Sequence, residues 1–312
     1  MRKVIGIGET IFDIIFKNGL PTQAVPGGST FNSMITLGRL GVPTRFITEV
    51  GNDTVGKIIL DFMHKNNLST ENVDIFDDGY AQSPISLAFL DENNDARYSF
   101  YHHFPQKRLH FLLPSVEADD LVIFGSYYAV DPLLREKIQE FISYAREQNA
   151  IIYYDINFRK SHAHEAMRIM PAFIENLEYA DIVRGSAEDF ETLLNETDAE
   201  KLYRNRISFD TPNFIYTDGA NGVDIFCRAG HSHIDTSPIK TRSTIGAGDN
   251  FNAGILFGLL QNDVSREQLS GLSLEKWTKV INHGISFASE VCQSYENYIS
   301  PEFVLRYKQE HR

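Results

Sequence analysis

Residues 121–124 (LVIF) and 151–155 (IIYYD) are short, almost wholly apolar runs, and residues 131–148 between them are predicted to form a helix. Strands that are apolar along their whole length are typical of a sheet covered on both faces. A strand, a helix and a second strand in this order form a βαβ unit, in which the two strands run parallel. This stretch therefore predicts a parallel sheet with helices packed on it.

The same alternation continues in both directions along the chain, which contains no internal repeat, low-complexity tract or proline-rich linker. Further strands are predicted at Val4–Ile7, Arg45–Val50, Asn213–Thr217 and Gly222–Phe226, and further helices near 31–40, 55–66, 165–178, 247–261 and 275–291. Repeated βαβ units predict a doubly wound, mostly parallel α/β sheet, here as one domain over residues 1–312.

Two regions depart from this alternation. Residues 83–104 hold two β-rich runs joined by a polar turn at 91–95, which is typical of a hairpin, and residues 11–16 form another β-rich run. We predict a small antiparallel sheet, formed from about 11–25 and 83–104, that acts as a lid over a site. A surface hairpin without a moving part fits these residues equally well.

The composition excludes several classes of function. The chain has 42 Asp and Glu against 29 Lys and Arg, a formal charge of −13, and no concentrated basic patch, so we expect no nucleic-acid partner. The apolar part of the N-terminus is too short for a secretion signal, and no run approaches the ~20 apolar residues of a membrane span. Cys227 and Cys292 form no CxxC motif. We therefore expect a cytoplasmic protein that acts on small molecules.

The segment 243–254 (STIGAGDNFNAG) carries the strongest chemical signal. Gly246, Ala247 and Gly248 precede a predicted helix, and a small-residue turn at a helix N-terminus offers free N–H groups to an anion. Asp249 follows in the first turn, where an ionised carboxylate can accept a proton from a hydroxyl. An anion cradle beside a base suits phosphoryl transfer to an alcohol. A bare G-x-G-D is more often an ordinary glycine-rich helix start with Asp as a helix-terminal charge, so the longer segment has to carry the argument.

The full segment resembles the C-terminal signature of the PfkB, or ribokinase-like, family. The resemblance implies a ribokinase-like α/β fold with a small β lid, and transfer of a phosphoryl group from MgATP to a sugar, a nucleoside or a related alcohol. It also implies that Gly246, Ala247 and Gly248 form an anion hole and that Asp249 is the catalytic base. ATP and Mg²⁺ are the expected cofactors.

The N-terminal half extends this resemblance to the sugar site. Gly27, Gly28 and Asn32, followed by LGRLG at residues 37–41, are similar to the N-terminal signature of the family. Asp13 resembles the family carboxylate that accepts hydrogen bonds from sugar hydroxyls. Asn32 can both donate to and accept from a sugar, although a helix N-cap explains it as well.

The segment 155–159 (DINFR) resembles the D-x-N-x-R segment of fructokinase-like and 2-keto-3-deoxygluconate kinase-like members. It follows a predicted strand, at the edge of the sheet where ligands of α/β proteins gather. Arg159 is therefore expected to bind the substrate or a phosphate, and a surface ion pair is the alternative.

The family's nucleotide-binding segments are also matched. The resemblance assigns nucleotide contacts to Ser186, Thr217, Gly219, Gly222 and Asn282, and a metal role, through water, to Asp189 in place of the usual Glu. The loop 217–222 is equally explained as a turn between two strands, and Asn282 as a solvated helix residue.

Three positions depart from the family pattern. Ser243 stands where most relatives carry an Asp that helps to hold a monovalent cation, so dependence on such a cation is not expected. His102 follows the lid tyrosine where fructokinase-like chains often carry Arg. Ser29 stands where ribokinases typically have Lys, which favours a hexose such as fructose over ribose.

We weigh four hypotheses. The first is a sugar kinase with fructose as substrate, and the second a kinase for ribose, a nucleoside or 2-keto-3-deoxygluconate. The third is a catalytically silent interaction subunit, supported only by Ser243 and Asp189. The fourth, an NAD-dependent dehydrogenase, lacks the third glycine of its motif after Gly6 and Gly8. The exposed edges of a lid sheet also favour pairing of two copies into a homodimer.

Overall fold

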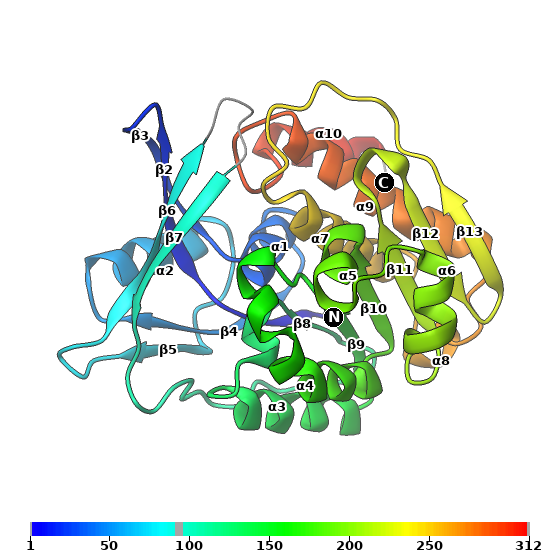
Figure 1. Ribbon diagram of the computed structural model, residues 1–312, viewed down its shortest axis with the longest axis horizontal. Helices are drawn as coiled ribbons and strands as arrows, with labels where there is room; N and C mark the ends of the chain where they lie inside the picture. The colour runs from blue at the N-terminus through cyan, green and yellow to red at the C-terminus, as the bar shows by residue number, and fades with distance from the viewer. Residues whose placement is uncertain (1, 91–95, 311–312) are drawn as a thin grey trace.

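The computed structural model describes residues 2–90 and 96–310 and contains two separate sheets. The nine-stranded sheet has the order β13-β12-β11-β10-β9-β8-β1-β4-β5, and the four-stranded sheet has the order β3-β2-β6-β7. The small sheet stands at one side of the large body (Figure 1). This arrangement confirms the predicted mostly parallel α/β sheet with a separate small β-sheet.

The large sheet is parallel from β5 through to β11, and β12 and β13 add an antiparallel hairpin at one edge. Its strands are β1 (Val4–Ile7), β4 (Thr44–Gly51), β5 (Val73–Phe76), β8 (Leu121–Gly125), β9 (Ile151–Asp155), β10 (Ile182–Ser186), β11 (Asn213–Thr217), β12 (Val223–Cys227) and β13 (Gly230–Ile234). The strands β5, β10 and β13 were not predicted from the sequence, because each is a short run with polar residues inside it.

Helices cover both faces of the large sheet. They are α1 (Ser29–Arg39), α2 (Thr54–Lys65), α3 (Arg135–Glu147), α4 (Ala166–Tyr179), α5 (Ala187–Leu194), α6 (Ala199–Leu202), α7 (Ala247–Gln261), α8 (Arg266–Leu269), α9 (Leu274–Cys292) and α10 (Pro301–Glu310). One apolar core joins the sheet to α1, α2, α7, α9 and α10, and the other joins it to α3, α4 and α5.

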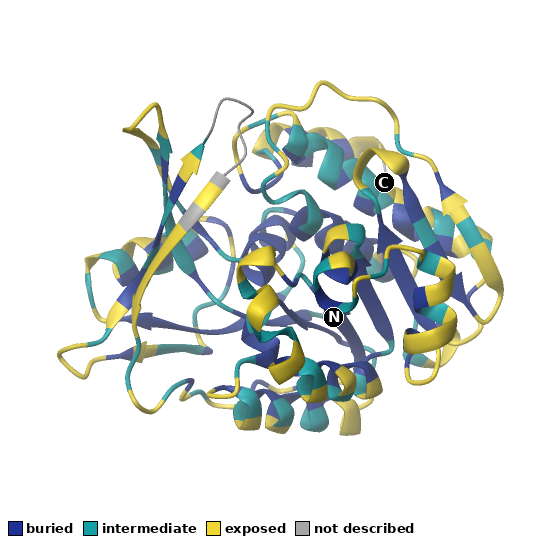
Figure 2. Ribbon diagram, viewed as in Figure 1, coloured by how far each residue is buried: buried dark blue, intermediate teal, exposed yellow. Residues whose placement is uncertain are grey.

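The strands alternate between these two cores. Val4 and Ile123 lie in the first core, whereas Ile5 and Phe124 lie in the second. Both faces of such a strand are buried, which is why its sequence is continuously apolar. Figure 2 shows the central strands of the large sheet as buried, whereas the edge strand β13 is largely exposed.

Helix α7 lies inside the body, and every residue from Asp249 to Leu259 is buried. It packs closely on α9, since a Cβ at Gly254 would lie 2.5 Å from the Cα of Gly284. A side chain at Gly254 would force the two helices apart. This packing fixes the N-terminus of α7, which carries Asp249.

The lid consists of β2 (Ile11–Lys17), β3 (Leu20–Gly27), β6 (Gln82–Leu90) and β7 (Ala96–His103). These bounds are close to those predicted, and the predicted turn at 91–95 lies outside the described residues. The sheet is mixed rather than antiparallel, because β2 pairs with β6 in parallel. The prediction of an antiparallel lid was wrong since the chain passes through α1, β4, α2 and β5 before β6 returns beside β2.

No helix of the described residues combines the length and apolarity that crossing a bilayer requires.

Candidate functional site

Most of the predicted site residues, though not Asn282 on α9, follow the carboxyl ends of the parallel strands or belong to the N-termini of α1 and α7. Arg159 follows β9, Ser186 ends β10 and Thr217 ends β11. Ligands of open α/β sheets bind at this edge, where loops and helix N-termini meet. The lid contributes Asp13 from β2.

Asp249 is 8% exposed, and residues of α1 hold it in place through hydrogen bonds. The hydroxyl of Ser29 donates to Oδ1 of Asp249 at 2.9 Å, and the amide of Asn32 donates to Oδ2 at 2.7 Å. The hydroxyl of Ser33 donates to the main-chain oxygen of Asp249 at 2.6 Å. These contacts fix the orientation of the carboxylate before any ligand arrives.

The sequence left two interpretations of Asn32 open, a sugar contact and a helix N-cap, and the structure bears on the second. Helix α1 begins after Gly28 without a side-chain cap, so Asn32 is not its N-cap. The amide nitrogen binds Asp249, while the buried Oδ1 of Asn32 has no partner among the described residues. Buried amide oxygens are normally hydrogen-bonded, so this atom is available to a ligand.

Burial raises the pKa of the Asp249 carboxyl, and the Asn32 hydrogen bond and the Arg159 charge partly offset that rise. A raised pKa makes a carboxylate a stronger proton acceptor, provided that it is still ionised. Asp249 is therefore a buried, hydrogen-bonded carboxyl with a raised pKa, and its role as the base stays a prediction.

Two further carboxyls lie near Asp249. Burial raises the pKa of Asp13 to about 6, and the hydroxyl of Ser86 donates a hydrogen bond to it. Burial also raises the pKa of Glu9, and the charges of Asp13 and Asp249 raise it further. Glu9 was not predicted as a site residue, although its place directly after β1 at the ligand edge was a usable signal.

Arg159 is exposed, yet its charge lowers the pKa of all three carboxyls, Glu9, Asp13 and Asp249. An electrostatic effect on three groups at once requires a position close to all of them. The structure thus brings Arg159 to the predicted sugar site.

Arg184 is a site residue that the sequence analysis missed. It is 7% exposed in β10, donates from Nη1 to Oδ1 of Asp155 at 3.0 Å, and donates from Nη2 to Oγ1 of Thr217 at 2.7 Å. Both Nη atoms lie 3.1 Å from the point where a Cβ at Gly248 would stand. A buried cation therefore lies directly beneath the Gly246–Gly248 turn. An arginine inside a short apolar strand was the available signal.

Ser186 and Asp189 form the capping box of α5. Oδ1 of Asp189 accepts the N–H of Phe158 at 2.8 Å, and Oδ2 accepts the N–H and the hydroxyl of Ser186, each at 2.7 Å. Both carboxylate oxygens thus already accept hydrogen bonds within the protein. This arrangement suits contact with a metal through water rather than direct ligation. The described residues include no group of three or more His, Cys, Asp or Glu arranged to hold a metal ion.

The loop 217–222 joins β11 to the antiparallel β12, as the turn interpretation requires. Gly219 and Gly222 have φ angles of 52° and 111°, in the left-handed region that favours glycine. Asn282 is exposed on α9. Nucleotide contacts of these residues stay a prediction.

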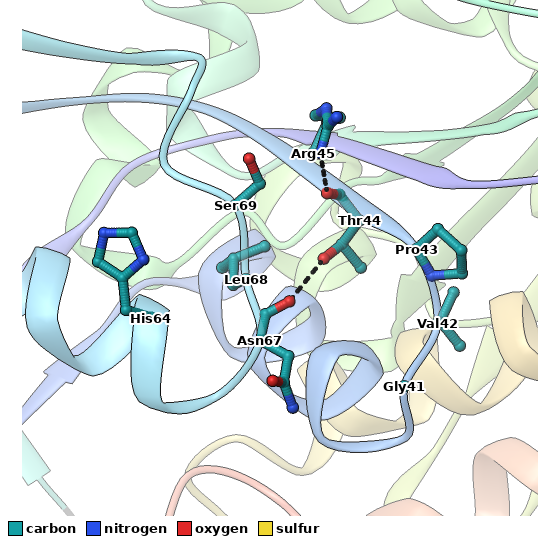
Figure 3. A pocket seen from close by; sticks show the side chains of 9 residues that line it. All are labelled: Gly41, Val42, Pro43, Thr44, Arg45, His64, Asn67, Leu68 and Ser69. Carbon is teal, nitrogen blue, oxygen red and sulfur yellow. Dashed lines mark hydrogen bonds between the residues drawn. The ribbon is translucent and has the colours of Figure 1, made fainter.

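A shallow pocket of about 660 Å³ lies elsewhere, and Figure 3 shows it. It is lined by the segment between α1 and β4, the start of β4, the end of α2 and the residues that follow α2, with Arg45 and His64 among them. Because β4 is parallel to β1, this is the amino edge of the sheet, opposite to the site. The pocket contains none of the predicted site residues.

Known proteins resemble this chain along almost its whole length. A 27% identical fructokinase from Rhizobium leguminosarum bv. trifolii aligns over 280 residues, which are 86% of this chain and 83% of that protein. A 23% identical 5-dehydro-2-deoxygluconokinase from Geobacillus thermodenitrificans (strain NG80-2) aligns over 298 residues, 92% of this chain and 87% of that protein.

Solved structures show the same fold. The fructokinase with bound ATP from Xylella fastidiosa superposes with a TM-score of 0.83, at 20% identity and with 99% of each chain covered. The family model described as pfkB family carbohydrate kinase matches residues 1–301. This chain therefore belongs to the pfkB family of carbohydrate kinases and is a sugar kinase.

Proposed function

We propose that the protein transfers a phosphoryl group from ATP to a hydroxyl of an uncharged sugar, with D-fructose as the leading substrate. The observation that carries this proposal is the fixed position of Asp249, held by Ser29 and Asn32 at the end of the Gly246–Gly248 turn. A base with a set orientation beside an anion-binding turn is what phosphoryl transfer to an alcohol needs.

In this mechanism Asp13, Gly27, Gly28, Asn32 and Arg159 bind and orient the sugar under the lid. Asp249 accepts the proton of the attacking hydroxyl. The N–H groups of the Gly246–Gly248 turn, with Arg184 beneath them, stabilise negative charge on the transferred group.

Bound MgATP would supply the phosphoryl group. Thr217, Gly219, Gly222, Ser186 and Asn282 would hold its nucleotide, and Asp189 would act on Mg²⁺ through water. Closure of the lid excludes water from the site, which limits hydrolysis of ATP. Pairing of two copies through the lid and a cytoplasmic location stay predictions.

The charges favour a neutral substrate over a sugar acid. Three carboxyls, Glu9, Asp13 and Asp249, lie within the electrostatic range of Arg159, which is a single cation. Two other cations at this edge of the sheet are already paired, Arg184 with Asp155 at 3.0 Å and Arg108 with the buried Glu49 and with Asp131 at 3.3 Å. A carboxylate of the substrate would therefore meet net repulsion. Among the relatives, this reasoning favours the fructokinase over the 5-dehydro-2-deoxygluconokinase as a guide to substrate.

The test is ADP release from MgATP with a panel of acceptors: fructose, ribose, glucose, adenosine, tagatose 6-phosphate and 2-keto-3-deoxygluconate. We expect fructose to be preferred, and Asp249→Asn to reduce kcat by about 10³-fold because it removes a positioned base. Asp263→Asn is the matched control, because Asp263 is exposed and pairs only with Arg2 among the described residues.

Near-normal turnover by Asp249→Asn would overturn the role of the base. A preference for 2-keto-3-deoxygluconate would overturn the argument from charge. Absence of both turnover and ATP binding would favour the alternative of a catalytically silent interaction subunit.

A further inference from the structure

Residues 293–300 join α9 to α10 and bring Asn297 to the predicted site. Asn297 is 3% exposed, and its main-chain oxygen accepts a hydrogen bond from Nδ2 of Asn250 at 2.8 Å. A Cβ at Gly246 would lie 3.0 Å from the same oxygen. The main chain of Asn297 is therefore packed against the beginning of the anion-binding turn.

The side chain of Asn297 points to a different part of the site. Its Nδ2 lies 3.7 Å from the point where a Cβ at Gly27 would stand, and Oδ2 of Asp13 lies 2.4 Å from that point. The amide and the carboxylate thus border the same small space above Gly27. The next residue, Tyr298, donates its hydroxyl to the carbonyl of Pro26 in β3, which holds this segment beside the lid.

The amide of Asn297 has no hydrogen bond to any residue in the ranges 2–90 and 96–310, although its main chain does. Its amide atoms are not completely sealed from solvent, unlike those buried polar atoms that lack a partner, such as Oδ1 of Asn32. Amides in so buried a residue normally have partners, so a ligand is expected to supply one.

We infer that Asn297 is a sugar-binding residue. Its amide donates a hydrogen bond to a sugar hydroxyl, and this is either the hydroxyl that donates to Asp13 or the neighbouring one. A sugar hydroxyl is both a donor and an acceptor, whereas an ionised carboxylate only accepts. Asp13 and Asn297 together satisfy both capacities. This inference rests on the proposed function, because it presumes a sugar at Asp13.

The position has a second consequence for the reaction. The side chain of Asn297 faces the sugar, while its main chain supports Gly246 and Asn250 at the anion-binding turn. One residue thus sets the separation between the bound sugar and the turn. An error of about 1 Å in such a separation reduces turnover strongly.

The experiment measures D-fructose affinity by calorimetry, and the KM values for fructose and for ATP, in two variants. Asn297→Ala removes the amide, and we expect a roughly 3- to 10-fold weaker fructose affinity, as for one neutral hydrogen bond, with the KM for ATP unchanged within about twofold. Asn297→Asp keeps the size but replaces the donor by a second carboxylate beside Asp13, and we expect it to weaken fructose binding further at neutral pH and less in acid.

The matched control is Ser294→Ala, in the same segment, whose hydroxyl bonds only neighbouring main-chain groups. We expect it to leave the KM for fructose unchanged. A series of monodeoxyfructoses then locates the contact, because the loss in Asn297→Ala should vanish for the analogue without the hydroxyl concerned.

Unchanged fructose affinity in both Asn297 variants would overturn this inference and leave the proposed function standing. The same holds for an equal loss with every deoxy analogue, or for a loss confined to the KM for ATP. If the wild-type protein binds no sugar of the panel, the proposed function fails, and this inference fails with it.

Discussion

The anion-binding turn and the lid contribute to the same site but are built differently. The turn begins a helix that is buried along its length, and Ser29 and Asn32 fix Asp249 through hydrogen bonds. The lid is a four-stranded sheet with no helix of its own, and it exposes Leu20, Phe89 and Tyr101. Packed elements have few alternative conformations, whereas elements with few buried contacts open at low cost.

This difference suggests a division of tasks between the two regions. The turn is fixed before the substrates bind, which suits the stabilisation of charge during transfer. The lid exposes apolar side chains and has no helix packed within it, which suits a role in recognition and closure. Substitutions around the turn should therefore change the KM for ATP and kcat, whereas substitutions in the lid should change mainly the KM for fructose.

After the loss of the base in Asp249→Asn, the largest expected effect concerns Arg184. Arg184→Met removes the cation beneath the turn, so we expect kcat/KM for ATP to fall by about 100-fold. The variant should also lose about 3 kcal/mol of stability, because it leaves Asp155 buried without its ion pair. Steady-state kinetics and thermal unfolding measure the two effects.

Arg184→Lys keeps the charge but loses one of the two hydrogen bonds, so its kinetic defect should be intermediate. Arg266→Met is the matched control, since Arg266 pairs with Asp181 at 3.1 Å, just before the amino end of β10. If the Arg266 variant impaired ATP use as strongly as the Arg184 variant, the division between the two regions would be wrong.

A smaller effect is expected at Asp13 in the lid. Asp13→Asn should raise the KM for fructose by about tenfold, with little change in the KM for ATP, because a charged acceptor for a sugar hydroxyl is lost. For the same reason, the wild-type KM for fructose should rise as the pH falls below about 6 and Asp13 becomes protonated.

Although Asp13→Asn should weaken the use of fructose, it should make the folded protein more stable. Because burial raises the pKa of Asp13 from 3.8 to about 6, the folded protein binds more protons than the unfolded chain between these values. The contribution of Asp13 to stability therefore falls as the pH rises through this window, and the ionised group destabilises the fold at neutral pH. Asp13→Asn should raise the Tm at pH 7.5 by a few degrees, and Asp61→Asn, at an exposed position in α2, should not. A lower Tm in Asp13→Asn would contradict this assignment.

The smallest expected effect concerns monovalent cations at the turn. Ser243 has no carboxylate, and the carbonyl of Cys292 beside it accepts the N–H of Arg242 at 2.8 Å. Replacing KCl by choline chloride at constant ionic strength should therefore change kcat by less than about twofold. Ser243→Asp supplies the missing carboxylate, and in this variant kcat should be higher in KCl than in choline chloride. A tenfold loss in choline chloride with the wild-type protein would contradict the prediction.

Much of this arrangement was predictable from local sequence patterns. The apolar strands, the helix after Gly246–Gly248 and the approximate bounds of the lid all follow from periodicity within short windows. The place of Asp249 at the start of α7 was predicted for the same reason.

The contacts that define the site were not predictable in this way. Asn32 and Asp249 are 217 positions apart, and their hydrogen bond depends on how α1 packs against α7. Arg184 lies in a strand that the sequence pattern did not predict, and Asn297 lies in a loop, so neither local pattern indicated a site residue. The parallel pairing of β2 with β6 also depends on the path of the whole chain.

The junction between β3 and α1 has a mechanical consequence. Gly28 alone separates the last residue of β3 from the first residue of α1, and its φ of 128° is open to few residues other than glycine. Ser29 and Asn32, which orient Asp249, stand immediately beyond it. An outward swing of the lid would therefore pull on the residues that aim the base. Gly28 therefore couples the position of the lid to the residues that hold Asp249, although the two regions are otherwise built separately.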